Sequence, residues 1–508
     1  MPRVLFSLYD TAETKEFALA FHNLGWEIIS TKETAALLSE TNIPTTRIEA
    51  YTGVHESYGI PPTLHPKIES ALTGDHIDWR IDIVYDIPYP LSKGNDIGGL
   101  TLLALAVKGR RLPVMTRTDM KRVISELEQR GEISGMLKSE LITKANVFIA
   151  SHYIELLRLA EDAGDGTVGV KSMKLLNGEN PYQTPCHLFA VPDDEDPLSM
   201  HRFKLLSGEA PCFTNLADLD CIVYTLCLAH EAFLKKFGRA PFLAVAAKHG
   251  NPCGFAADWR DPRVVVEKAL FGNPGVIWGG EFITNFAINE DLAALLYESD
   301  ARKERFGSGF WMLDLVAAPS FLEEALAILG KRRARKVLEN KALEDPRLFR
   351  KAWGIRPVRG GFIRQPPSSY VLDFNGTELT RLDLTDENYG SLILAWATSW
   401  SSSLGGNEVA LVKDLQLIGA GGGPATVIAA SNGVIRAREG NHCIEDAVFA
   451  ADAFFPYIDA PEILADSGCV LGLVPRGGRH EEEVRSFFQS KDINMCFLPE
   501  QFRGFCRH

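Results

Sequence analysis

The chain has 508 residues, 46% of them hydrophobic, and a formal net charge of -13, so it can form several domains with their own cores. The acidic balance argues against broad nucleic-acid binding, because phosphate backbones are bound by concentrated Lys and Arg. Nine cysteines without a C-x-x-C pair, no apolar run near the roughly 20 residues that span a bilayer, and no signal-type start favour a cytoplasmic protein with reduced thiols and no membrane contact.

The first 125 residues alternate between short apolar runs and helical patterns. Strands are expected at 4–8, 26–30 and 81–85, and helices at 14–24 and 33–39. The glycine-rich stretch 96–99 leads into a further apolar helix. This alternation predicts a parallel α/β domain. Residues 118–162 read as largely helical and polar, which is typical of a bridge between domains.

The second part of the chain begins near Lys174. A long helical pattern at 218–237 leads into an apolar strand at 242–247, and an apolar helix at 392–401 leads into a strand at 409–412. We expect a helix over 323–339 whose basic end, 331–336, is solvated. The glycine cluster 419–423 lacks the following Lys of a phosphate loop and is interpreted as a strand and turn.

The dipeptide Lys248-His249 stands where the strand 242–247 ends. We expect it at the carboxyl end of a parallel strand, where open α/β sheets place their sites. His is a natural general base near neutral pH, and an adjacent ammonium can stabilise a developing oxyanion. The structural alternative is a solvated Lys beside a His that caps a turn.

Several ordered segments give the dipeptide its context. Residues 248–254 match the pattern K-H-x-N-P-C-G. Further segments are Asn-Gly-Glu-Asn-Pro-Tyr-Gln at 177–183, Phe-Thr-Asn-Leu-Ala-Asp at 213–218, Ala-Pro-Ser-Phe at 318–321 and Asp-Ala-Phe-Phe-Pro at 452–456. Thr-Leu-His-Pro at 63–66 and Asp-Ile-Gly-Gly at 96–99 belong to the N-terminal part. Together they resemble the bifunctional family of aminoimidazole carboxamide ribonucleotide (AICAR) formyltransferase and inosine monophosphate (IMP) cyclohydrolase.

The resemblance implies an α/β fold with an N-terminal methylglyoxal-synthase-like parallel sheet domain and two cytidine-deaminase-like α/β subdomains. The boundaries expected are 1–125 for the first domain, 126–170 for a helical bridge, and 171–370 and 371–508 for the two formyltransferase subdomains. It further implies a homodimer with transferase sites at the subunit interface. The co-substrate would be 10-formyltetrahydrofolate, and catalysis would need no metal.

The resemblance also implies roles for single residues. His249 would be the base, Lys248 the oxyanion stabiliser, and Asn407 would orient the substrate and the His. Arg503 would bind the substrate phosphate, and the other substrate-binding positions would be Asn180, Gly208 and Asn215. The folate positions would be Phe454, Phe455, Pro456 and Asp459. The structural alternatives are a turn-forming role for Asn407, core packing for the two Phe residues, and a solvated basic residue for Arg503.

The sequence departs from the family most clearly in the cyclohydrolase region. The nucleotide loop S-T-G-G-T reads Ser-Thr-Lys-Glu-Thr at 30–34, and the segment at 60–66 lacks the Arg and the catalytic Lys of the family. Tyr89, Asp96, Lys108 and Thr63 remain at matching positions. We expect this site to be weak or lost, because bare amides and cations hold a phosphate.

The transferase region departs in its phosphate contacts. Leu176-Asn177 stands in place of an Arg that binds the substrate phosphate, and Ala425 in place of a second Arg. Three hypotheses remain open. The chain formylates AICAR beside a separate cyclohydrolase, formylates a related amine in specialised metabolism, or is an inactive paralogue that binds a nucleotide or folate. The retained Lys248, His249 and Asn407 favour an enzyme.

Overall fold

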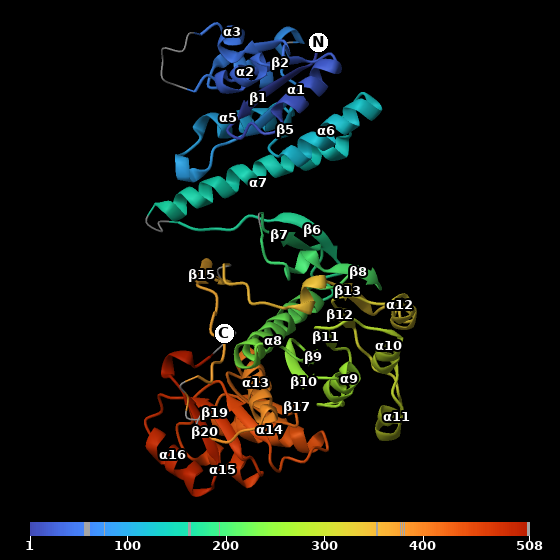
Figure 1. Cartoon of the computed structure of the whole chain (residues 1–508), viewed down its shortest axis with the longest axis vertical. Coiled ribbons are helices and arrows are strands. Elements are labelled where there is room, and N and C mark those ends of the chain that lie inside the picture. Colours follow the sequence, from blue (N-terminus) through green and yellow to red (C-terminus); the bar gives the residue numbers. More distant parts are fainter. Residues whose placement is uncertain are drawn as a thin grey trace. The chain divides into compact units, whose positions relative to one another are not determined.

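The computed structural model describes the chain except for residues 55–60, 76, 161–163, 193, 352–353, 376, 378, 380–381 and 505–508. Ile60 and Cys506 therefore lie outside the described residues. The chain divides into two compact units (Figure 1): one holds residues 1–172 and 189–194, the other 173–188 and 195–508. The eight described cysteines are free thiols, as expected. None of the described helices is long and apolar enough to cross a membrane.

The first unit is built on a five-stranded sheet in the order β3-β2-β1-β4-β5, with every neighbouring pair parallel. Its strands are β1 (Arg3–Leu8), β2 (Glu27–Ser30), β3 (Thr45–Arg47), β4 (Ile83–Ile87) and β5 (Leu112–Val114). The parallel α/β domain predicted for this region is confirmed. Both sheet faces are apolar because helices cover both of them.

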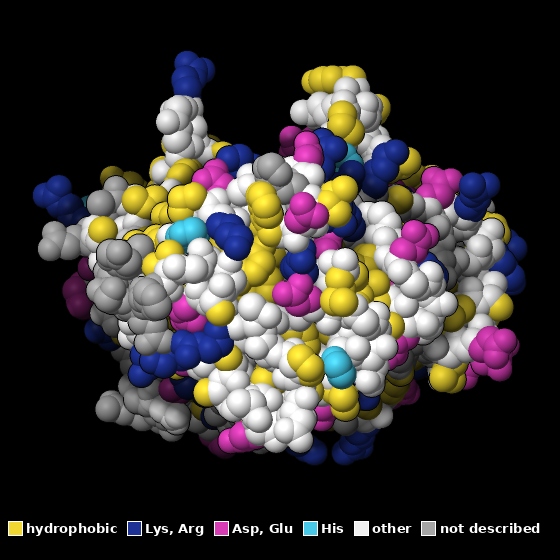
Figure 2. Space-filling model, turned by 90° about the horizontal axis from the view of Figure 1, so that it is seen from above, with side chains coloured by type: hydrophobic (Ala, Val, Ile, Leu, Met, Phe, Trp, Pro, Cys, Tyr) yellow, Lys and Arg dark blue, Asp and Glu magenta, His cyan; other side chains and the backbone are white. Residues whose placement is uncertain are grey.

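One face of this sheet packs on α1, α6 and α7, and the other on α3, α4 and α5. The helices are α1 (Thr14–Asn23), α2 (Lys32–Ser39), α3 (Ile48–Thr52), α4 (Pro66–Thr73), α5 (Ile97–Lys108), α6 (Arg117–Arg130) and α7 (Gly135–Leu159). The helical character predicted for 118–162 is thus confirmed for α6 and α7. In space-filling view, acidic and basic side chains lie interspersed on the face shown in Figure 2.

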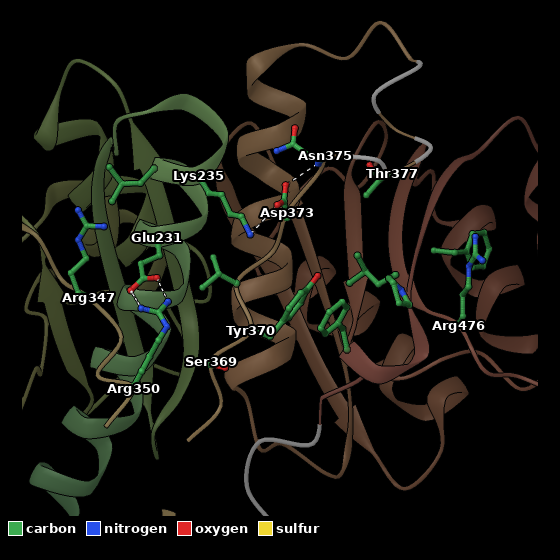
Figure 3. Close-up of a pocket in the computed structure, with 16 residues that line it drawn as sticks. Glu231, Lys235, Arg347, Arg350, Ser369, Tyr370, Asp373, Asn375, Thr377 and Arg476 are labelled. Carbon is green, nitrogen blue, oxygen red and sulfur yellow. Dashed lines mark hydrogen bonds and ion pairs between the residues drawn. The ribbon is translucent and has the colours of Figure 1, made fainter. Parts of the chain in front are cut away.

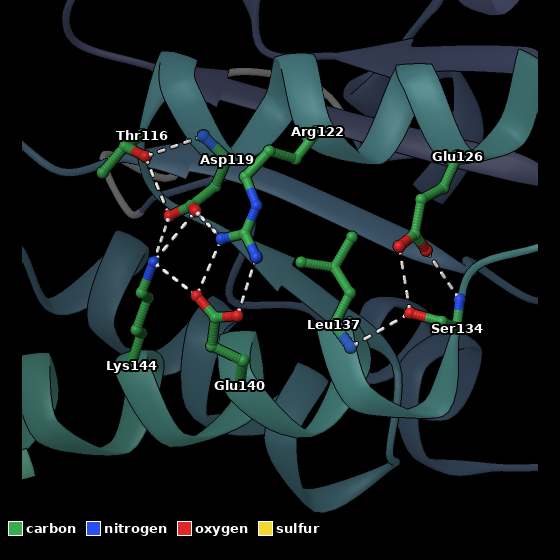
Figure 4. A network of polar contacts seen from close by, with 8 residues as sticks. All are labelled: Thr116, Asp119, Arg122, Glu126, Ser134, Leu137, Glu140 and Lys144. Carbon is green, nitrogen blue, oxygen red and sulfur yellow. Dashed lines mark hydrogen bonds and ion pairs between the residues drawn. The ribbon is translucent and has the colours of Figure 1, made fainter. Parts of the chain in front are cut away.

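A polar network fastens α6 to α7 (Figure 4). The buried carboxylate of Asp119 accepts hydrogen bonds from Arg122 at 3.0 Å and from Lys144 of α7 at 2.9 Å, and Arg122 also binds Glu140 at 2.7 Å. The cations lower the pKa of Glu140 to about 2. The network satisfies a buried acid and fixes the angle between the two helices, a structural role.

The second unit contains one eleven-stranded sheet in the order β20-β19-β18-β16-β17-β10-β9-β11-β12-β13-β8. Its strands are β8 (Lys204–Ser207), β9 (Phe242–Lys248), β10 (Asn251–Asp258), β11 (Glu281–Thr284), β12 (Leu315–Ala318), β13 (Lys336–Glu339), β16 (Asn407–Lys413), β17 (Gln416–Gly423), β18 (Val448–Ala451), β19 (Leu471–Pro475) and β20 (Asn494–Leu498). Two small sheets pair β6 (Val170–Leu175) with β7 (Cys186–Ala190), and β14 (Gly354–Val358) with β15 (Gly361–Gln365).

The large sheet is an internal duplication. Each half begins with a long helix and a hairpin, α8-β9-β10 or α13-β16-β17, and continues with alternating helices and strands. The halves meet where β10 runs antiparallel to β17, so the strand order of one half repeats that of the other outward from this seam. The two α/β subdomains expected from the family are therefore two halves of one sheet.

The two faces of this sheet are covered differently. The helices α8 (Phe213–Phe237) and α13 (Asp386–Ser401) share one core that runs across both halves. On the other face, each half has a core of its own under the remaining helices. These are α9 (Pro262–Leu270), α10 (Glu290–Tyr297), α11 (Asp300–Phe306), α12 (Glu323–Leu329), α14 (Thr426–Glu439), α15 (Asp459–Asp466) and α16 (Glu481–Ser490).

The helix expected over 323–339 is wrong in its second part. The helix α12 ends at Leu329, and residues 336–339 form β13 inside the sheet. Arg335 is buried rather than solvated, with its guanidinium donating to the carbonyls of Trp311 at 2.8 Å and Leu313 at 3.1 Å. Burial lowers the pKa of Arg335 to about 10. Sheet pairing overrides the helical pattern here because the basic residues find carbonyl partners inside the fold.

Candidate active site

Lys248 and His249 lie at the tip of the β9–β10 hairpin. Lys248 pairs with Asn251 across the hairpin, and the two turn residues, His249 and Gly250, have positive φ angles of 53° and 69°. Such pairs form type I′ turns, which match the twist of the flanking strands. A side chain at Gly250 would come within 2.7 Å of the Cys221 sulfur of α8, so glycine is required there.

The expected carboxyl end of a parallel strand is wrong. The strand β9 runs antiparallel to both of its neighbours, β10 and β11. The dipeptide is presented by a tight hairpin turn, which places a non-glycine residue, His249, in the left-handed region. Such backbone conformations persist only where the surroundings hold them, and they are frequent at functional sites.

A cavity of about 170 Å³ lies at the hairpin tip. Its polar lining comes from both halves of the sheet: Lys248, His249, Asn251, Asn273 and Arg436. The ammonium of Lys248 donates to the carbonyl of Gly279 at 2.7 Å, and the guanidinium of Arg436 donates to the carbonyl of Ala420 at 2.7 Å. Three basic side chains and two amides around one small cavity suit a ligand group that carries or develops negative charge.

The segment before β16 is tied to this turn. The backbone N–H of Ser403 donates to Asn251 Oδ1 at 2.6 Å, a bond between residues 152 positions apart in the chain. The same segment ends at Asn407, whose side-chain amide donates to the carbonyl of Gly423 at 3.1 Å. Asn407 lies outside the residues that line the cavity, on the segment whose Leu404 lines it.

The glycine cluster 419–423 lies in β17 as expected, and its members have two packing roles. Side chains at Gly419 or Gly421 would overlap the backbone of α14 at 2.2–2.3 Å. A side chain at Gly422 would lie 2.5 Å from a carboxylate oxygen of Glu408. The cluster therefore lets α14 and Glu408 approach the strand closely, and its fit is steric.

The predicted folate and phosphate residues all lie in the second half of the unit, but one of them, Phe455, belongs to its core. The guanidinium of Arg503 lies 5.9 Å from the centre of the half-buried Phe454 ring and 3.6 Å from the Glu500 carboxylate. Pro456 is half-buried, and Asp459 is exposed at the start of α15. Phe455 is fully buried in the core of this half, beside Phe449 and Phe488.

Asn215 connects the first turn of α8 to a buried acid. Its side chain accepts from the backbone of Cys212 at 3.2 Å and donates to Glu281 Oε1 at 3.5 Å. Burial raises the pKa of Glu281 to about 9, and the charge of Asp218 raises it further, against a lowering by Lys248. The side chain of Asn215 is thus already engaged inside the protein.

The other two predicted substrate positions have clear structural settings. Asn180 is exposed in a turn, where its backbone and side-chain N–H groups both donate to Gln183 Oε1 at 2.8 Å and 3.0 Å. Gly208 has a φ of 101°, and a side chain there would meet the Arg335 carbonyl at 1.9 Å. Gly208 allows the close passage of the chain from β8 past β13.

In the first unit, three of the four expected cyclohydrolase residues lie together. Both Tyr89 and Gly99 donate their backbone N–H to the Asp96 carboxylate, at 3.1 Å and 2.8 Å. Thr63 is buried against the start of α5, since a side chain at Gly98 would meet its hydroxyl at 3.1 Å. Lys108 lies at the opposite end of this twelve-residue helix, about 16 Å away at 1.5 Å per residue, in an exposed ion pair with Glu69.

A buried acid that the motifs did not single out lies beside this group. Asp86, at the end of β4, is fully buried, and its Oδ2 has no hydrogen-bond partner among the described residues. Burial raises the pKa of Asp86 to about 8, a hydrogen bond from Ser7 opposes this, and the charge of Asp96 adds to it. The carboxylate of Asp96 makes this place unfavourable for a phosphate.

A second cavity of the C-terminal unit, about 1060 Å³, is larger but holds none of the predicted site residues. Figure 3 shows two of its cations turned onto acids: Arg350 binds Glu231, and Lys235 binds Asp373 at 3.0 Å. We do not take this cavity as the active site. These two cations already have acidic partners, and none of the predicted site residues lines it.

Sequence patterns missed three participants of the hairpin site: Arg436, Ser403 and Glu408. Arg436 and Ser403 belong to no motif, and only their position beside Lys248-His249 identifies them. Glu408 follows Asn407 directly in the sequence. A charged residue beside a predicted site Asn was the available signal.

Comparison with known proteins covers the whole chain. The family model described as AICARFT/IMPCHase bienzyme matches residues 111–435, and the MGS-like domain model matches residues 13–109. The bifunctional purine biosynthesis protein PurH of Thermotoga maritima is 28% identical over 519 residues, covering 100% of both chains. Its namesake from Neisseria meningitidis serogroup A is 27% identical over 532 residues, covering 95% of each.

Among solved structures, one described as "Crystal structure of ForH" is 24% identical, with a TM-score of 0.28, over 32% of this chain and 99% of that one. The family match spans more than half of the chain and includes the hairpin with Lys248 and His249. The chain belongs to the AICARFT/IMPCHase bienzyme family, the family of the bifunctional purine biosynthesis proteins.

Proposed function

We propose that the chain transfers a formyl group from 10-formyltetrahydrofolate to the 5-amino group of AICAR, with IMP cyclohydrolase activity weak or lost. The observation that carries the proposal is the hairpin tip, where Lys248 and His249 border one small cavity with Arg436. A general base, an ammonium and a guanidinium at one place are what transfer of an acyl group to a weak amine requires.

The chemistry assigns a separate task to each side chain. The imidazole of His249 takes one proton from the amine as its nitrogen attacks the formyl carbon. The ammonium of Lys248 stabilises the negative charge that develops on the formyl oxygen. When the bond from carbon to the folate nitrogen breaks, that nitrogen receives a proton, which Lys248 can donate. Atoms and charges balance, since the amine loses one proton and the leaving nitrogen gains one.

The folate residues fit this role in part. Phe454 presents a half-buried ring, and Arg503 lies against it, which suits a flat ring and a negatively charged group. The core position of Phe455 favours its structural alternative. We therefore assign ring contact to Phe454 and a supporting role to Phe455.

The reduced cyclohydrolase activity rests on charge. The phosphorylated ring-closure substrate would meet the Asp96 carboxylate, while Lys108 is engaged by Glu69 at the other end of α5. A carboxylate repels a dianionic phosphate unless cations or free backbone amides hold it.

One observation favours a second candidate acceptor, a related amine that lacks the phosphate group of AICAR or carries it elsewhere. Leu176 and Asn177 replace the family's phosphate-binding Arg, and Leu176 is exposed. The donor and the catalytic hairpin would be the same. Arg503, still present, favours AICAR.

Two assays test the proposal. Tetrahydrofolate formation from 10-formyltetrahydrofolate is followed by absorbance with AICAR, with its unphosphorylated riboside and with other aminoimidazoles. A second assay follows conversion of formyl-AICAR to IMP. We expect turnover with AICAR and ring closure near the uncatalysed rate. Turnover with the other amines alone would favour the second acceptor, and tight binding without any turnover would favour an inactive paralogue.

We also propose a homodimer. The helix α7 exposes several large apolar side chains, as expected of a surface that a second subunit covers. They are Met136, Tyr153, Leu157 and Leu159. Sedimentation equilibrium should give twice the chain mass, and a monomer at micromolar concentration would contradict the proposal.

A further inference from the structure

A single carboxylate oxygen organises the segment that precedes Asn407. Glu408 Oε1 accepts the backbone N–H groups of Leu404 at 2.7 Å, Gly405 at 2.9 Å and Gly406 at 3.2 Å. Three successive N–H groups that converge on one point form a nest, a concave arrangement that binds an anion. Here the protein fills the nest with its own side chain.

The backbone of Glu408 is held in turn by a buried acid. Glu408 is 3% exposed, and its backbone N–H donates to Asp452 Oδ1 at 2.7 Å. Its second carboxylate oxygen packs against Gly422, where any side chain would come within 2.5 Å. A glutamate at position 408 therefore fits only because position 422 in β17 is a glycine.

These bonds reach from the hairpin turn to the C-terminal segment of the proposed site. Asn251, two residues after His249, accepts from Ser403 at one end of the segment, and Glu408 binds the N–H groups that follow. The backbone carbonyl of Asp452 accepts the N–H of Gly504 at 3.0 Å, directly after Arg503. Hydrogen bonds and short stretches of backbone therefore connect the hairpin turn with the residue after the C-terminal arginine.

We propose that Glu408 is a positioning residue that sets the place of Asn407 and of the 403–406 segment relative to His249. The proposal rests on the proposed function and assigns Glu408 no contact with substrate. A carboxylate is used because three N–H groups bind one charged oxygen more firmly than a hydroxyl oxygen. Burial raises the pKa of Glu408, opposed by its three backbone bonds and by the charge of Arg436.

Two variants separate positioning from charge. Glu408→Ala removes the acceptor, and Glu408→Gln keeps one acceptor oxygen at nearly the same place. The matched control is Glu231→Ala, which removes another poorly exposed glutamate that accepts a backbone N–H, that of Leu348 at 2.7 Å, in the large cavity away from the hairpin.

We expect Glu408→Ala to lower kcat about 10- to 100-fold, because misplacement by about 1 Å costs this much. The KM for 10-formyltetrahydrofolate should stay within about threefold, and Glu408→Gln should keep kcat within about threefold of wild type. Glu231→Ala should lose thermal stability but not kcat. Hydrogen exchange of the amides of residues 404–406 should speed up at least about tenfold in Glu408→Ala alone.

The exchange measurement needs no activity, so it tests the positioning even if wild type transfers no formyl group, which would refute only the proposed function. Unchanged exchange at 404–406 in Glu408→Ala would overturn the proposal. So would an active enzyme in which Glu408→Ala and Glu231→Ala have the same kcat.

Discussion

The two units differ in what surrounds their buried acids. In the second unit, Glu408 and Asp452 accept backbone N–H groups from segments that carry predicted site residues, and Lys248 lies near Glu281. In the first unit, Asp86 has an oxygen without a hydrogen-bond partner among the described residues and another acid, Asp96, as its neighbour. A domain can keep its helices and strands while its polar side chains no longer form an active site.

The difference also appears in how each unit uses its cations. Lys248 and Arg436 line one cavity in the second unit, while each also donates to a backbone carbonyl. In the first unit, Lys108 forms an exposed ion pair with Glu69, and Lys67 donates a hydrogen bond to the carbonyl of Tyr51. Matching residues at family positions are therefore a poor guide to function until their partners are known.

The largest effect should come from the base. His249→Asn removes it while keeping a residue that tolerates a positive φ. We expect kcat for formyl transfer to fall about 10³-fold, within the range for general-base catalysis. The absorbance assay measures it, and His480→Asn, an exposed histidine near Glu483, serves as the control. Near-normal activity of His249→Asn would contradict the proposal that the second unit carries the catalytic base.

The next effect separates a structural glycine from a substrate contact. Gly208→Ala places a carbon 1.9 Å from the Arg335 carbonyl in a left-handed conformation. We expect a loss of about 2–4 kcal/mol in the free energy of unfolding of the second unit, by denaturant titration. The KM for AICAR of the folded fraction should not change. A raised KM with unchanged stability would show a substrate role instead.

A pH-dependent effect should arise in the first unit. The folded protein keeps a proton on Asp86 up to about pH 8, whereas the unfolded chain loses it near pH 4. The contribution of Asp86 to the free energy of unfolding is therefore complete below pH 4. It falls by about 1.4 kcal/mol per pH unit as the pH rises to 8. Asp86→Asn should lack this slope when stability is measured between pH 5 and 8. Equal slopes in both proteins would mean that Asp86 is ionised in the fold.

The smallest effect is expected at Lys108. Its ion pair with Glu69 is exposed, so Lys108→Ala should change the free energy of unfolding by less than about 0.5 kcal/mol. It should also leave the slow conversion of formyl-AICAR to IMP unchanged. If this variant abolished a measurable cyclohydrolase activity, the first unit would retain more of its site than we propose.

Sequence patterns by themselves determined the elements that carry the chemistry. The apolar run 242–247 ends at Lys248 as a strand, and Asp96 begins a helix, because local periodicity and capping fix such elements. The ordered motifs also identified the family. They left open whether Phe455 contacts a ligand or the core, and they took Arg335 for a solvated residue.

Only the tertiary structure decided which strands pair and what each side chain meets. The antiparallel setting of β9, the burial of Arg335 and the bond between Asn251 and Ser403 depend on segments far apart in the chain. The duplication of the sheet carries no visible sequence repeat. Local patterns record burial periodicity but not partners, and the free energy of a buried polar group is set by its partner.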